Sequence, residues 1–84
     1  MFTVYVLYSI GHNKIYIGFS SNLEARIAAH NAEKGKGYTH AYRPWKVIHT
    51  DFFETKSEAQ KREKQLKSAR GRAFIWNLIK SSSS

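Results

Sequence analysis

The stretch FTVYVLYSIGHNKIYIGF, residues 2–19, decides the fold. Its two flanks, residues 2–9 and 14–19, are rich in valine, isoleucine and tyrosine, which favour β-strands. The four residues between them, Ile10 to Asn13, are of the type found in turns. The sequence therefore predicts an antiparallel hairpin at the start of the chain.

The register of this hairpin decides which side chains lie together. If Tyr5 pairs with Gly18 and Leu7 with Tyr16, both tyrosines lie diagonally on one face, whereas a one-residue slip separates them. A tyrosine in a strand is usually a core residue, and this interpretation holds for each one taken singly. Gly18 is more informative, because glycine weakens a strand unless another backbone or a ligand must come close.

The rest of the chain alternates helix and strand. Ser21-Asn22-Leu23-Glu24 has the capping-box pattern, which predicts a helix from Ser21 to about Ala32. Residues 34–44 read as a polar loop with glycines, and residues 45–53 as a third strand dense in aromatic and β-branched side chains.

A second capping box, Thr55 to Glu58, predicts a helix that ends near Gly71. A short helix over residues 72–80 follows, with its apolar side chains as core contacts, namely Phe74, Ile75, Leu78 and Ile79. We therefore expect one α+β domain over residues 1–80, and a disordered serine tail over residues 81–84. Its three-stranded antiparallel sheet is flanked by helices in the order β-β-α-β-α-α.

The charge of the chain favours a polyanionic partner. Fourteen Lys and Arg against six Asp and Glu give a net charge of +8 over 84 residues. Nucleic acid is the commonest partner of such a protein, although a basic protein without a particular partner has the same composition. The chain has no cysteine, which excludes disulfides and thiolate metal sites, and its histidines lack zinc spacing. It has no apolar run of membrane-spanning length and no secretory leader, so we expect a cytoplasmic protein that does not bind membranes.

Two helices carry candidate functional side chains. Glu63 shares a helix face with Ala59 and Leu66, where a carboxylate is costly unless a cation, a donor or a metal satisfies it. A surface pair with Lys67, four residues later, is an equally good interpretation. Arg26 and His30 project together from the first helix and suit phosphate binding, although both also fit an ordinary solvated face.

These residues together resemble a known family. Thr3-Val4-Tyr5 followed by Tyr16-Ile17-Gly18 resembles the paired motif of the GIY-YIG nucleases, with a first triplet that keeps only its tyrosine. The segment SNLEARIAAH is similar to the family's first helix, so its arginine and histidine fall on Arg26 and His30. The runs GYTHAYRPWKVI and FFETKSEAQKREKQLKS are similar to the small stand-alone branch, whose helix glutamate falls on Glu63. An asparagine found late in many relatives has only Asn77 as a counterpart, in a dissimilar context.

The resemblance implies an endonuclease that hydrolyses DNA with one Mg²⁺ or Mn²⁺ ion held by Glu63. Magnesium keeps several of its waters, so a single protein carboxylate can suffice. In this mechanism Arg26 stabilises charge on the phosphate, and Tyr5 or Tyr16 takes a proton from the attacking water, with His30 orienting a tyrosine hydroxyl. Gly18 is the structural residue of the site. The sequence leaves open which tyrosine is the base.

The expected partner is DNA, with branched or flapped DNA as candidate substrates and a protein partner as a candidate source of specificity. The side chains expected to bind nucleic acid are basic or aromatic: Lys34, Lys36, Tyr38, Arg43, Trp45, Lys46, Lys64 and Lys67. Two alternatives have the same charge and aromatic content. One is a binding module of the same fold without turnover, and the other is an RNA-directed protein or a subunit that nicks only with a partner.

Overall fold

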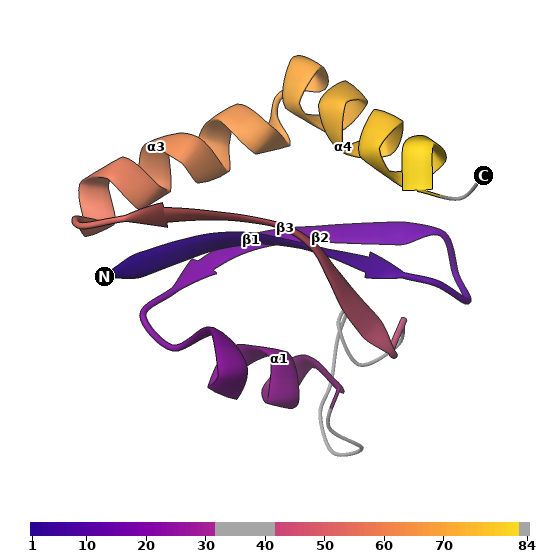
Figure 1. Cartoon of the computed structure of the whole chain (residues 1–84), viewed down its shortest axis with the longest axis horizontal. Coiled ribbons are helices and arrows are strands. Elements are labelled where there is room, and N and C mark those ends of the chain that lie inside the picture. The colour runs from indigo at the N-terminus through magenta and orange to yellow at the C-terminus, as the bar shows by residue number, and fades with distance from the viewer. Residues whose placement is uncertain (32–41, 83–84) are drawn as a thin grey trace.

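A computed structural model describes residues 1–31 and 42–82 of the chain. Figure 1 shows a central sheet with helices on both of its faces. The elements in chain order are β1 (Phe2–Ser9), β2 (Lys14–Ser20), α1 (Leu23–Asn31), β3 (Trp45–Phe53), α3 (Lys56–Lys67) and α4 (Ala69–Ser82). The expected α+β fold and its element order are confirmed.

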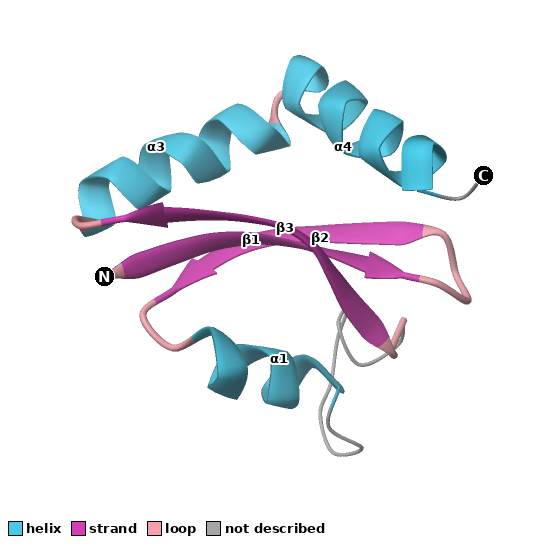
Figure 2. Ribbon diagram, viewed as in Figure 1, coloured by secondary structure: helices cyan, strands magenta, loops and turns pink. Residues whose placement is uncertain are grey.

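The three strands are antiparallel and lie in the order β2-β1-β3 (Figure 2). Tyr5 pairs with Gly18 and Leu7 with Tyr16, which is the register that places both tyrosines on one face. The turn between β1 and β2 places Asn13 at φ 53°, a left-handed conformation that asparagine tolerates better than most residues. Because β1 is central, its side chains are the most enclosed, and Val4 to Leu7 have no exposed surface.

Each face of the sheet has its own apolar cluster. On the face covered by α3 and α4, the core consists of Val4, Val6, Ile17, Ala59, Leu66 and Ile75. On the face covered by α1, the core consists of Tyr5, Leu7 and Trp45, with Leu23 and Ile27 of α1 packed against it. Strict alternation along β1 thus divides its side chains between two layers of helix.

The two helix starts differ in how well the sequence predicted them. At α3 the expected cap is confirmed, because the amide of Glu58 donates to the Thr55 side chain at 3.2 Å. At α1 the expected cap is wrong: the helix begins at Leu23, and Asn22 accepts from the amide of Ala25 at 3.2 Å. Asparagine is as good a cap as serine, and two adjacent candidates make the start ambiguous by one residue.

The boundary between α3 and α4 lies earlier than expected. α3 ends at Lys67 and Ser68 is extended, with φ −70° and ψ 168°. The Ser68 hydroxyl accepts from the amide of Gly71 at 3.2 Å, so it caps α4. Gly71 therefore does not stop a helix. It lies within α4, and a Cβ there would be 2.2 Å from the backbone oxygen of Gln65, so only glycine fits this crossing of the two helices.

α4 is longer and less buried than expected. It extends to Ser82, which takes two serines from the expected tail, while residues 83 and 84 lie outside the described residues. Phe74 is not a core contact, since it is 40% exposed and meets the ring of His49 edge-on at 5.5 Å. Among residues 1–31 and 42–82, no helix is long and apolar enough to cross a membrane.

Candidate active site

The site is centred on the two strand tyrosines. Tyr5 lies in the middle of β1 with no exposed surface, and Tyr16 lies in β2 and is half-buried. Their rings are stacked, with centroids 6.3 Å apart and an interplanar angle of 26°. The two phenols therefore form one unit on the face of the sheet that α1 covers.

Gly18 makes room for these phenols. It lies opposite Tyr5 in the ladder, and a Cβ on it would be 2.9 Å from the Tyr5 hydroxyl oxygen and 3.1 Å from Cε1 of Tyr16. Any other residue would push one of the two rings out of place. The glycine is thus explained by a close approach, with the Tyr5 side chain lying across the edge strand β2.

Arg26 of α1 supplies a cation at the Tyr5 hydroxyl. The two side chains are joined by a hydrogen bond, in which the guanidinium donates. α1 positions Arg26 because Leu23 and Ile27, on the neighbouring faces of the helix, pack against the Tyr5 cluster. An arginine in this place can bind a phosphate beside the phenol.

Glu63 approaches from the other helical layer. Its side chain is 20% exposed, and its carboxylate accepts from Nζ of Lys67 at 3.3 Å and acts on the ionisation of Tyr5. The expected pair with Lys67 is thus confirmed, and the charge of Glu63 also acts on the ionisation of Tyr5. Because β2 is an edge strand without a side chain at Gly18, α3 can act on a hydroxyl across that edge.

The surroundings of Tyr5 raise the pKa of its hydroxyl above the usual value. Burial is the largest cause, and the charges of Tyr16 and Glu63 act in the same direction. The hydrogen bond and the positive charge of Arg26 oppose this rise but do not cancel it. Tyr5 is therefore a neutral phenol near pH 7, one that gains acidity if the charge of Glu63 is neutralised.

The donor set fits one hard cation. Among the described residues there is no group of three or more His, Cys, Asp or Glu that could enclose a metal. A single partly exposed carboxylate, with phosphate oxygens and waters as further ligands, suits Mg²⁺. Lys67 is 49% exposed, and such a surface pair contributes little, so a divalent cation can displace its ammonium from Glu63.

Several expected site residues lie elsewhere or outside the described residues. Lys34, Lys36 and Tyr38 fall in residues 32–41, and the His30 side chain is also outside the described part. Trp45 was wrongly expected to bind nucleic acid. It is 5% exposed and packs in the core cluster beside Tyr5, because its position as the first residue of β3 points the ring inward.

The remaining basic residues are dispersed. Lys46 and Lys64 are exposed, on β3 and α3, Arg43 is half-buried, and Lys67 pairs with Glu63. Asn77 is exposed on α4. Of the residues expected at the site, the structure brings together Tyr5, Tyr16, Gly18, Arg26 and Glu63.

Sequence reasoning missed one supporting residue, Asn31. Its side chain accepts from the amide of Trp45 at 2.6 Å and donates to the carbonyl oxygen of Trp45 at 3.3 Å. These two bonds fix the end of α1 to the start of β3, and so hold Arg26 over the sheet. An asparagine near a helix end usually indicates a local cap, so no sequence signal points to this long-range contact.

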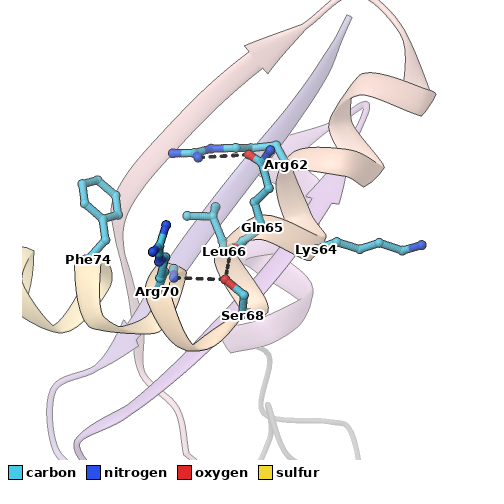
Figure 3. A pocket seen from close by; sticks show the side chains of 8 residues that line it. Arg62, Lys64, Gln65, Leu66, Ser68, Arg70 and Phe74 are labelled. Atoms are coloured by element: carbon cyan, nitrogen blue, oxygen red, sulfur yellow. Dashed lines mark hydrogen bonds between the residues drawn. The ribbon is translucent and has the colours of Figure 1, made fainter.

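A pocket of about 590 Å³ lies where α3 meets α4, away from the tyrosines (Figure 3). It is lined by Arg62, Gln65, Ser68, Arg70 and Phe74, among others. Figure 3 shows Arg70 between Phe74 and Ser68, while the Lys64 side chain points away from the pocket. None of the five residues that meet at the tyrosine site lines it.

Comparison with known proteins matches this arrangement to a family. The family described as the GIY-YIG catalytic domain matches residues 1–77. The UPF0213 protein of Staphylococcus haemolyticus is 47% identical over 55 residues, which cover 66% of this chain and 67% of that protein. The UPF0213 protein of Natronomonas pharaonis is 42% identical over 65 residues, covering 77% and 75%.

A solved structure has the same fold. The solution structure of the UPF0213 protein BH0048 from Bacillus halodurans is similar with a TM-score of 0.54 and 30% identity, covering 93% of this chain and 85% of that one. With a family match over nearly all of its length and a similar solved fold, this chain belongs to the GIY-YIG catalytic domain family.

Proposed function

We propose that this protein is a metal-dependent endonuclease that hydrolyses phosphodiester bonds of DNA, with Tyr5, Tyr16, Arg26 and Glu63 as its active site. The observation that carries the proposal is the environment of one hydroxyl. Tyr5 is hydrogen-bonded by Arg26, stacked on Tyr16 and within the electrostatic reach of Glu63. Family membership supports the same reaction class.

Arg26 is proposed to bind the scissile phosphate. Its side chain is exposed apart from the bond to Tyr5, so a non-bridging phosphate oxygen can reach the guanidinium from solvent. A planar guanidinium can hold two phosphate oxygens at once and stabilises the charge that develops on them.

Tyr5 is the proposed general base. Arg26 and Glu63 both act on the ionisation of the Tyr5 hydroxyl. A divalent ion bound by Glu63 would supply Lewis acidity at the phosphate and lower the pKa of a nearby water. Glu63 raises the pKa of Tyr5, so neutralising this carboxylate eases loss of the phenol proton. Tyr16 is proposed to position the Tyr5 ring by stacking.

Branched and flapped DNA are the proposed substrates, and one panel experiment tests this proposal. Purified protein is incubated with flapped, branched and linear DNA of shared sequence, with Mg²⁺, with Mn²⁺ or with EDTA. We expect cleavage near the junction that EDTA abolishes. RNA versions of the same panel test for the RNA-directed alternative.

Two results would contradict the proposal. Cleavage that persists in EDTA would show that the reaction needs no divalent metal. Tight binding of all three DNA forms without cleavage of any would favour the non-catalytic binding module.

A further inference from the structure

Two adjoining hollows run along the edge strand β2, starting at the proposed active site. The first, of about 390 Å³, is lined by Ile15, Tyr16, Ile17, Lys67 and Arg72. The second, of about 280 Å³, is lined by Asn13, Lys14, Ile15, Arg72 and Trp76. They share Ile15 and Arg72. From Tyr16 to Asn13 the strand advances about 10 Å, so the hollows form one short groove from the site to the hairpin turn.

Arg72 is the shared cation of this groove. It lies in the first turn of α4, is exposed, and makes no side-chain hydrogen bond or ion pair with any other described residue. Lys67 stands at the end of the groove nearest Glu63. Among residues 1–31 and 42–82, no acidic residue lines either hollow. A groove with cations and without acids selects an anionic ligand.

The apolar residues that line the groove set a second requirement for the ligand. Ile15, Ile17 and Trp76 contribute apolar surface, and the Trp76 ring is held edge-on to Tyr8 with centroids 6.3 Å apart. A ligand with alternating phosphates and flat apolar groups meets both requirements. Single-stranded nucleic acid has this character, since cations bind its backbone and aromatic rings stack with its unpaired bases.

We propose that this groove binds a single-stranded DNA arm that leaves the cleavage site, with Arg72 on a phosphate and Trp76 stacked on an unpaired base. The inference rests on the proposed function and assigns a binding surface to the single-stranded arm of its proposed substrates. A fully paired duplex cannot offer a base to Trp76, because its bases are stacked within the helix. The groove therefore selects flapped or branched DNA over linear duplex.

Binding measurements in EDTA test the groove without turnover. The ligands are a flapped DNA and the same duplex without the arm, followed by fluorescence anisotropy. We expect Arg72→Ala to weaken binding of the flapped DNA about tenfold, the loss typical of one charge-assisted contact, and to leave duplex binding nearly unchanged. The salt slope for the flapped DNA should fall by about 0.7, the value for one phosphate of a single strand.

Arg70→Ala is the matched control. It removes the same charge from the same turn of α4, but Arg70 lines the α3–α4 pocket in Figure 3 and neither hollow of the groove. Two residues correspond to about 200° around a helix, so the two arginines face different surfaces. We expect Arg70→Ala to weaken binding of both DNAs by the same small factor. Equal behaviour of the two variants would overturn the proposal.

Trp76 gives a second test. Trp76→Leu removes the stacking ring and should weaken arm binding about tenfold, while Trp76→Phe should recover part of the loss. Circular dichroism confirms that each variant is folded. Full arm binding by a folded Trp76→Leu protein would overturn the assignment.

The proposed function can fail separately from the groove. If the wild-type protein cleaves no DNA but binds flapped DNA more tightly than duplex, and this preference depends on Arg72, the groove is supported and the nuclease function is contradicted. If it cleaves DNA and all groove variants bind the arm as tightly as wild type does, the nuclease function is supported and the groove is contradicted.

Discussion

At the scale of single residues, one hydroxyl and one missing side chain define the site. Tyr5 has no exposed surface and hydrogen-bonds Arg26, while Gly18 lets its ring lie across β2. A larger residue at position 18 would prevent this close approach of the Tyr5 ring to β2. Gly18 and Tyr5 can therefore be tested independently. A substitution of Gly18 changes the volume available to the rings, and a substitution of Tyr5 changes proton transfer.

Gly18→Ala should damage the site without unfolding the protein. The added Cβ would lie 2.9 Å from the Tyr5 hydroxyl oxygen, so the phenol must shift. We expect a stability loss of about 1–3 kcal/mol. Misplacing the phenol should slow DNA cleavage about 100-fold. Gly11→Ala is the control, since nothing lies within 4 Å of a Cβ there. Urea unfolding and single-turnover cleavage check both variants, and equal effects at the two glycines would contradict the account.

Tyr5→Phe should abolish the pH dependence of cleavage. Because burial raises the pKa of Tyr5, its phenolate fraction grows throughout the range from pH 7 to about pH 9.5. The logarithm of the wild-type rate should therefore rise with a slope near one. Tyr5→Phe should lose this slope and about 10²–10⁴ of the rate, as for loss of a general base.

Tyr16→Phe is the control for this prediction, because it keeps the stacked ring while removing the other hydroxyl. We expect it to retain the slope and to slow cleavage far less. A pH–rate profile that Tyr16→Phe flattens and Tyr5→Phe preserves would make Tyr16 the base.

At the scale of elements, the sequence predicted strands better than helix ends. Alternation and one turn predicted the hairpin and the faces of its strands, and left two registers, of which only one places both tyrosines on one face. The helix ends did not follow, since Ser21 and Asn22 are both good caps and Gly71 resembles a stop signal. Its true role, a close crossing of α4 over Leu66, depends on a contact between helices that no local pattern encodes.

The link between β3 and α3 makes an element-scale prediction. Asp51 accepts from Arg62 Nε at 2.8 Å and lies 3.0 Å from His49 Nε2. Burial alone would raise the pKa of Asp51, but the hydrogen bonds and charges of Arg62 and His49 outweigh it and lower the pKa. The ion pair of Asp51 and Arg62 joins the end of β3 to α3, the helix that carries Glu63. Asp51→Asn should thus destabilise the protein at pH 7 by about 1–2 kcal/mol.

The sign of the pH dependence follows from the lowered pKa. The contribution of Asp51 is fully present above the ordinary carboxyl value of about 3.9, and it is lost as the pH falls through the folded-state pKa. Urea midpoints of wild type and Asp51→Asn should converge as the pH falls through the lowered pKa of Asp51. Glu54→Gln, an exposed change nearby, should show no such convergence. A gap between wild type and Asp51→Asn that stays constant with pH would contradict the role of the pair.

At the scale of the whole molecule, the sheet carries groups from both helical layers to one place. α1 supplies Arg26 from one face and α3 supplies Glu63 from the other, and the two act on the same phenol. The family resemblance implied that Tyr5, Tyr16, Arg26 and Glu63 belong to one site, while the His30 side chain lies outside the described residues. The resemblance could not predict that Trp45 is core, or that α4 brings Arg72 and Trp76 to β2, because both depend on how the layers pack.

The most direct test of the proposed active site compares two glutamates of the same helix. Glu63→Gln removes the proposed metal ligand, and Glu58→Gln removes the same charge at the start of α3, where a capping box tolerates glutamine. Single-turnover cleavage of a flapped DNA with Mg²⁺ should fall at least about 100-fold in Glu63→Gln, with DNA binding retained. It should stay near wild type in Glu58→Gln. Cleavage at the wild-type rate by Glu63→Gln would contradict the account.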